Sequence, residues 1–260
     1  MTLPISFDDQ INRRASLSDL SRDLIVDFLK KVESPLAGLA KKMSMADLGC
    51  QMKIVGGAKG VLFPKNVGLL FFNSEPHRFF PGTQIDVVWL PEGTGGKFPK
   101  KIFCGPLDRM TREALDYIRR NYISETVIKH RDRAEATRVE NFPDSAIEEA
   151  VTNAVCHRSY EQHEPIEVRI SKHELVVLSY PGPGRSVRMA QLQAGRVSSR
   201  RCRNHRIGEF FKELDMTEDR AAGIPKILHS MKRNGSSLPE FESDKDHTYF
   251  KCRLPIHPQA

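Results

Sequence analysis

The sequence has few of the features that mark secreted, disulfide-bonded or membrane-spanning proteins. Its five cysteines are scattered, with no Cys-x-x-Cys pair. An odd, scattered set argues against a disulfide framework and a zinc site, and predicts plain buried or half-buried thiols. No apolar run approaches the roughly 20 residues of a membrane span. The N-terminus lacks the basic start and apolar core of a secretory signal, so we expect a cytoplasmic protein without membrane contact.

The Gly-x-x-x-x-Gly-Lys-(Ser/Thr) loop of motor NTPases is also missing, which argues against a helicase motor. The composition, 39% hydrophobic and 28% charged residues, is typical of a folded globular chain. The net charge of +7 is compatible with a polyanionic partner such as DNA or a nucleotide. A charge of this size fits an ordinary basic protein equally well.

The clearest helix pattern lies in residues 143–160. Ser145 followed by Glu148 has the spacing of a capping box, and Asp144 adds negative charge near the expected helix N-terminus. The apolar residues recur at the spacing of one buried helix face: Ile147, Ala150, Val151, Ala154 and Val155. The sequence therefore predicts an amphipathic helix that buries this face.

A second face of this helix carries a column of polar residues, namely Glu149, Asn153, His157 and Tyr160. Chemically, Glu149 could accept a proton from water, and the amide oxygen of Asn153 could complete the shell of a hydrated Mg²⁺. The alternative is a half-exposed helix with ordinary surface groups, because a Glu and an Asn four residues apart are common there.

The segment Glu149-Ala-Val-Thr-Asn153-Ala-Val-Cys-His157-Arg158-Ser-Tyr160 resembles the signature of the ATPase-like domain in bacterial RecG-related transcriptional regulators. Those proteins belong to the GHKL group of ATP-binding folds. The resemblance implies that Glu149 is the general base, that Asn153 is the Mg²⁺ ligand, and that His157 lies at the cofactor. It also implies an α/β (α+β) fold of Bergerat type, a sandwich with a mixed, mostly antiparallel sheet.

We expect this domain over residues 61–254, with a signature helix at 144–160, a lid at 180–203 and a tail at 255–260. Residues 1–60 predict three short helices and a hairpin, which suit either a winged-helix layout or a helical bundle supporting the next domain. In the family a DNA-binding domain of Schlafen/AlbA type usually precedes the Phe7-Asp8-Asp9 segment, at which this sequence begins.

Other elements follow from periodicity. For residues 124–142 the pattern predicts one strand and a connection. The predicted helices lie at 64–73, 107–122 and 203–214. The predicted strands lie at 85–89, at 166–170 paired with 175–178, near 241 and at 248–254. Together they predict a sheet with helices packed against it.

Two glycine turns correspond to the family's nucleotide-contacting turns. The resemblance places Gly182 and Gly184 beside the nucleotide, although a Pro/Gly hairpin exit explains them nearly as well. Gly223 corresponds to a glycine at the start of a helix, where free N–H groups can bind a phosphate. The aspartate that reads adenine in most GHKL proteins is absent, because Ser179 and Tyr180 stand before Gly182.

The stretch from 185 to 206 is rich in arginine and has no acidic residue. The resemblance makes it a lid over the phosphates, with Arg200, Arg203 and Asn204 at the cofactor. Several guanidinium groups could neutralise a triphosphate or grip a nucleic-acid backbone. The alternative is a solvated basic loop.

The leading interpretation is a bacterial transcriptional regulator or DNA-associated protein that binds ATP and Mg²⁺. The nucleotide would bias a conformation or a homodimer, with slow Mg-dependent hydrolysis through Glu149. The alternative is a degenerate, non-catalytic GHKL scaffold that binds DNA or protein. A third interpretation uses His157 as the base of a different enzyme, although a helical histidine is more often structural.

Overall fold

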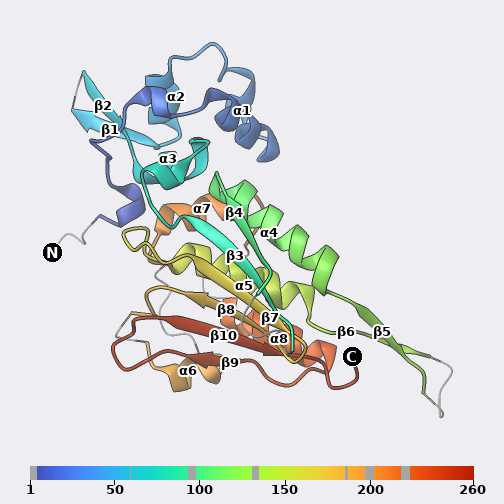
Figure 1. The fold of residues 1–260 in the computed structure, drawn as a ribbon. Helices are drawn as coiled ribbons and strands as arrows, with labels where there is room; N and C mark the ends of the chain where they lie inside the picture. Colours follow the sequence, from blue (N-terminus) through green and yellow to red (C-terminus); the bar gives the residue numbers. More distant parts are fainter. Residues whose placement is uncertain are drawn as a thin grey trace.

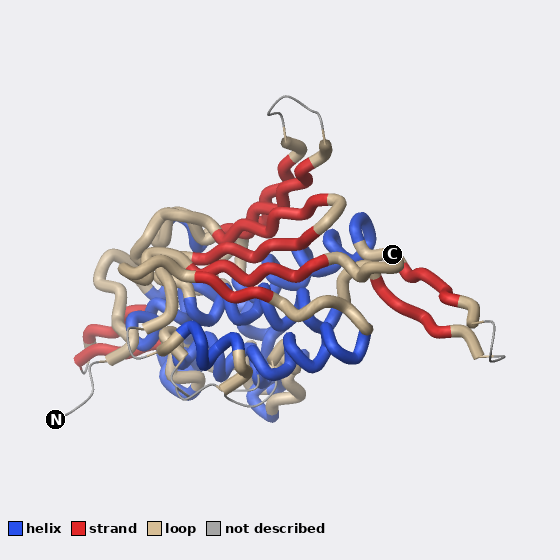
Figure 2. The backbone as a smooth tube through the Cα atoms, turned by 90° about the horizontal axis from the view of Figure 1, so that it is seen from below, coloured by secondary structure: helices blue, strands red, loops and turns tan. Residues whose placement is uncertain are grey.

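The computed structural model describes residues 5–58, 60–92, 98–130, 135–184, 187–196, 202–217 and 223–260. Figures 1 and 2 show a sandwich in which the principal helices cover one face of a six-stranded sheet. The strands, in spatial order, are β4 (Lys100–Cys104), β3 (Gln84–Leu90), β7 (Ile166–Ser171), β8 (Glu174–Ser179), β10 (Phe250–Pro255) and β9 (Glu240–Glu242). Only β3 and β7 run parallel, so the predicted mixed, mostly antiparallel sheet is confirmed.

The sheet has a buried and a solvated face because apolar residues alternate along its strands. In β7, Ile166, Val168 and Ile170 are buried, whereas Arg169 is exposed. The helices of this layer are α4 (Leu107–Tyr122), α5 (Asp144–His157), α7 (His205–Glu213) and α8 (Gly223–Asn234), with a short α6 (Met189–Gln193) next to β9. No described helix is both long and apolar enough to cross a membrane.

Helix α5 confirms the predicted signature helix, but not the capping box. The helix starts at Asp144, with Pro143 in the N-cap position and no side-chain cap. The Asp144 N–H donates to Glu140 Oε2 at 2.9 Å, and Ser145 Oγ bonds Ser230 Oγ of α8 at 2.9 Å. The capping box fails because the carboxylate of Glu140, four residues before Asp144, accepts from the helix N-terminus and Ser145 bonds a serine of a neighbouring helix.

The N-terminal region confirms the expected short helices and hairpin. The second helix is shorter than predicted, a single 3₁₀ turn in place of residues 36–43. The elements are η1 (Phe7–Asp9), η2 (Leu17–Asp19), α1 (Arg22–Lys31), η3 (Pro35–Gly38), α2 (Met45–Gln51), β1 (Val55–Ala58), β2 (Val61–Pro64), α3 (Asn66–Phe72) and η4 (Pro76–Arg78). An aromatic cluster, defined as Phe28, Phe71, Phe72, Phe210 and Phe211, joins α1 and α3 to α7. The N-terminal region and the sheet layer therefore share one hydrophobic core.

A two-stranded hairpin projects from the body, formed by β5 (Glu125–Ile128) and β6 (Thr137–Glu140) (Figure 1). The prediction of one strand plus a connection was therefore wrong. The second strand is short and mostly polar, and a cross-strand ion pair between Arg138 and Glu125 at 2.6 Å helps to hold it. Polar cross-strand pairs of this kind do not produce the alternation of apolar and polar residues by which a strand is recognised in a sequence, so β6 was missed.

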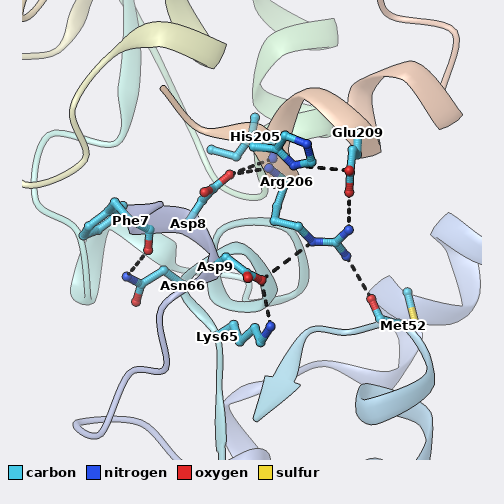
Figure 3. A network of polar contacts seen from close by, with 10 residues as sticks. Phe7, Asp8, Asp9, Met52, Lys65, Asn66, His205, Arg206 and Glu209 are labelled. Atoms are coloured by element: carbon cyan, nitrogen blue, oxygen red, sulfur yellow. Dashed lines mark hydrogen bonds and ion pairs between the residues drawn. The ribbon is translucent and has the colours of Figure 1, made fainter. Parts of the chain in front are cut away.

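The segment Phe7-Asp8-Asp9 is tied to the start of α7 (Figure 3). Asp8 Oδ2 accepts hydrogen bonds from the backbone N–H groups of Arg206, at 2.6 Å, and Ile207, at 3.0 Å. Asp9 pairs with Lys65 at 2.7 Å, and the Arg206 guanidinium reaches Met52 O at 3.1 Å. Arg206, which the sequence placed among the cationic lid residues, thus holds the N-terminal region to α7.

Candidate functional site

Glu149 and Asn153 lie one turn apart on α5, as their spacing predicted. Glu149 is only 5% exposed, so the interpretation of α5 as a half-exposed helix with surface groups was wrong at this position. Asn153 Nδ2 donates to Glu149 Oε1 at 3.1 Å, and Lys226 Nζ of α8 lies 3.6 Å from Glu149 Oε2. A buried carboxylate therefore lies between an amide and an ammonium group at the junction of α5 and α8.

Helix α8 begins at Gly223, directly against this pair. A Cβ at Gly223 would lie 2.4 Å from Asn153 Nδ2 and 2.8 Å from Glu149 Oε1, so any larger residue would require these two side chains to move. The first turn of α8 consequently starts beside Asn153. The positive end of the helix dipole therefore lies at this junction.

The predicted polar column ends at His157, which is exposed at the last residue of α5. Tyr160 is not part of that column, because the helix stops before it and its side chain turns into the core. Its hydroxyl donates to Val155 O at 2.8 Å, and the Arg158 guanidinium carbon lies 4.9 Å from the ring centroid. Burial raises the pKa of Tyr160, so the phenol stays protonated.

Gly182 and Gly184 differ in their surroundings. A Cβ on Gly182 would lie 2.5 Å from Ser243 Oγ and 2.6 Å from Tyr249 O, in the turn between β9 and β10. A Cβ on Gly184 would meet no atom of the described residues within 4 Å. The packing of Gly182 against this turn thus explains its missing side chain without a ligand, whereas the surroundings of Gly184 are open.

We expect Gly182→Ala to lower the free energy of unfolding by about 1–3 kcal/mol, because the added methyl group overlaps backbone oxygen. Thermal unfolding of the variant checks this prediction. Gly184→Ala is the matched control and should leave the melting temperature nearly unchanged. Equal melting temperatures for Gly182→Ala and the unsubstituted protein would contradict the packing role.

Asn204 and Arg203 lie at the C-terminal end of α5. Asn204 is buried, and its Nδ2 donates to Cys156 O at 3.0 Å and to Arg158 O at 2.8 Å. It therefore satisfies carbonyl groups at the end of α5. Arg203 donates to Gly182 O at 3.2 Å, and burial lowers its pKa. Arg200 lies outside the described residues.

The structure thus separates the predicted site residues into two groups. Glu149, Asn153 and Gly223 meet at the junction of α5 and α8, whereas His157, Gly182, Arg203 and Asn204 gather near the end of α5. Sequence reasoning missed Lys226, whose pairing depends on how α8 crosses α5. Within the described part of the chain, no group of three or more His, Cys, Asp or Glu residues is placed to hold a metal ion.

Residues 163–252 match the family model described as "Putative ATP-dependent DNA helicase recG C-terminal". The chain therefore carries a RecG-related, HATPase-like domain over that range, which includes β7, β8, α7 and α8. The match begins after α5, so it does not cover Glu149 or Asn153. No curated protein matches the chain.

The fold is also similar to that in the crystal structure of the DIP2311 protein from Corynebacterium diphtheriae. The TM-score is 0.70 and the sequence identity 19%, over 98% of this chain and 48% of that protein. At this identity the similarity shows the fold alone. The chain spans about half the length of the DIP2311 protein.

Proposed function

We propose that the junction of α5 and α8 binds ATP with Mg²⁺, and that the bound nucleotide biases the conformation or dimerisation of a DNA-associated regulator. The observation that carries the proposal is the buried contact of Glu149 and Asn153 with the N-terminus of α8. The family match over residues 163–252 supports the proposal, because the description of that family names an ATP-dependent protein.

The residues present fit such a ligand chemically. Asn153 uses Nδ2 to bond Glu149, which leaves its Oδ1 as the oxygen that would take part in a Mg²⁺ shell. The Lys226 ammonium group and the positive end of the α8 dipole would attract phosphate oxygens. Bound Mg²⁺ would supply neutralisation of the phosphate charge.

The contacts at this junction also favour a conformational role over rapid turnover. Gly223 lies so close to Asn153 that an added Cβ would overlap its amide, so a phosphate between the two would require the first turn of α8 to move away from α5. Lys226 would then exchange Glu149 for the phosphate, which leaves the carboxylate able to accept a proton from water. A ligand that binds only the separated arrangement shifts the chain toward it.

Calorimetric titration with ATP, with and without Mg²⁺, tests the proposal. We expect Mg-dependent binding that Asn153→Ala weakens by about 10–100-fold, the loss of one contact to a charged group. Glu148→Ala is the matched control on the same helix, because Glu148 faces Arg119 of α4 and should not affect binding. Absence of binding at millimolar ATP, or equal affinity in Asn153→Ala, would refute the site.

The second candidate is a non-catalytic scaffold that binds DNA. The ion pair between Lys226 and Glu149 favours it, because that contact occupies the carboxylate that would have to accept a proton from water. Ser179 and Tyr180 favour it as well, since neither supplies a carboxylate for adenine. Steeply salt-dependent DNA binding without any Mg-dependent ATP binding would support this candidate over the first.

A further inference from the structure

Two cysteines that are 46 residues apart in the chain meet at the C-terminal end of α5. Cys156 is the penultimate residue of α5 and is 6% exposed. Cys202 precedes α7 and is half-buried. Cys202 Sγ contacts Cys156 O at 3.4 Å, and the two side chains are near enough for each to shift the pKa of the other.

Neighbouring polar groups fix this arrangement. Asn204, two residues after Cys202, binds Cys156 O through both its backbone N–H, at 3.3 Å, and its side chain, at 3.0 Å. His157 Nε2 lies 4.0 Å from Cys202 Sγ on the exposed side. The hydrogen bonds of Asn204 therefore hold the segment that carries Cys202 against the end of α5. The half-buried Cys202 thiol lies next to the exposed His157 imidazole.

The surroundings divide the pair into a thiolate and a thiol. The hydrogen bond from Cys156 and the nearby His157 lower the pKa of Cys202 to about 4, against the opposing effect of burial. The same hydrogen bond, together with burial, raises the pKa of Cys156 well above its ordinary value. These opposite shifts favour the thiolate at Cys202 and the protonated thiol at Cys156.

We propose that Cys202 is a peroxide-reactive thiol and that Cys156 is its resolving partner, so that oxidation closes a disulfide between the end of α5 and the residue ahead of α7. The ligand class is a hydroperoxide, with hydrogen peroxide as the simplest member. The site depends on the thiol geometry alone and not on nucleotide binding.

The chemistry balances in two steps. Cys202 thiolate attacks a peroxide oxygen, so that an S–O bond forms, the O–O bond breaks and the leaving hydroxide takes a proton to become water. Cys156 sulfur then attacks the Cys202 sulfenic acid, so that the S–S bond forms and the S–O bond breaks. The departing hydroxide takes the Cys156 proton as a second water. The two sulfurs lose two electrons in total, and the peroxide gains them.

The other cysteines provide an internal comparison. Cys50 and Cys104 are exposed, which corrects the expectation of five buried or half-buried thiols. Burial and the charge of Asp86 raise the pKa of Cys104, and burial raises the pKa of Cys252 to about 12. Exposure alone would make Cys50 and Cys104 react first, whereas the proposed site makes Cys202 react first.

Peptide mapping under non-reducing conditions, after limited hydrogen peroxide treatment of the full chain, tests the proposal. We expect a Cys156–Cys202 disulfide to form about tenfold or more faster than oxidation of Cys50 or Cys104. In Cys156→Ser, dimedone should instead trap a sulfenic acid on Cys202, and Cys202→Ser should give neither product. Preferential oxidation of Cys50 or Cys104 would overturn the proposal. If Cys156→Ser does not fold, the map of the unsubstituted protein decides the question.

A pH series separates an activated thiol from a merely accessible one. The titratable or charged groups around Cys202 are Asp8, Cys156, His157, Tyr160 and Arg203. Between about pH 5.5 and 7.5 an ordinary thiol is alkylated about tenfold faster per pH unit, because its thiolate fraction rises. Cys202 should react at a nearly constant rate across this range. A tenfold rise per unit at Cys202 would contradict the assignment.

Discussion

Replacing Arg158 by alanine should lower the free energy of unfolding by about 3–5 kcal/mol, because it empties a buried site and removes the hydrogen bonds that the guanidinium donates to backbone carbonyl groups. Arg158 is 1% exposed and is among the largest fully buried side chains. Its guanidinium donates to Gly82 O at 2.6 Å and Glu164 O at 3.0 Å, with a longer contact to Gln162 O at 3.3 Å. It thereby joins the end of α5 to the segments that lead into β3 and β7.

Chemical denaturation measures this effect, with the fluorescence of Trp89 in β3 as the probe. Arg169→Ala is the matched control, since the exposed Arg169 side chain pairs with Glu167 at the surface and its loss should change the free energy by less than about 1 kcal/mol. Arg158→Lys keeps the charge but loses the fork of donors, so its effect should fall between the two. Equal stabilities for Arg158→Ala and Arg169→Ala would show that the buried bonds contribute little.

The role of Arg158 illustrates what local sequence cannot reveal. Its place after a helix and before Tyr160 is visible in the sequence, but its main acceptor, Gly82, lies 76 residues earlier. The same reason explains part of the failure of the capping box, because the Ser145 hydroxyl bonds Ser230, which lies 85 residues later in the chain. Helices and strands with a clear apolar period were predictable, because that period is a local property of the chain.

The candidate site divides in the same way. Glu149 and Asn153 could be placed together because a four-residue spacing on a helix puts two side chains on one face. Their burial, and the presence of Lys226 beside them, depend on α8 and could not be predicted from that spacing. Gly182 carried a ligand-like signal, yet its missing side chain makes room for the β9–β10 turn. A glycine that allows a close approach does not specify what approaches.

The aromatic cluster carries the second large expected effect. Phe71→Ala should lower the free energy of unfolding by about 3–5 kcal/mol, the usual cost of truncating a buried phenylalanine. Phe71 is buried in α3, and its ring centroid lies 5.1 Å from that of Phe210 and 5.6 Å from that of Phe211, both on α7. Removal of this ring opens a cavity where the N-terminal region meets the sheet layer.

Because the core is shared, Phe71→Ala should destabilise the sheet as well as the N-terminal region. Trp89 reports the sheet, where its ring stacks on Tyr122 at 5.5 Å between centroids, away from the aromatic cluster. We expect its fluorescence transition to move to lower denaturant together with the far-ultraviolet circular dichroism transition. Phe98→Ala, at a side chain 49% exposed, is the control and should move neither. An unmoved Trp89 transition in Phe71→Ala would mean that the N-terminal region unfolds independently, despite the contacts of α3 with α7.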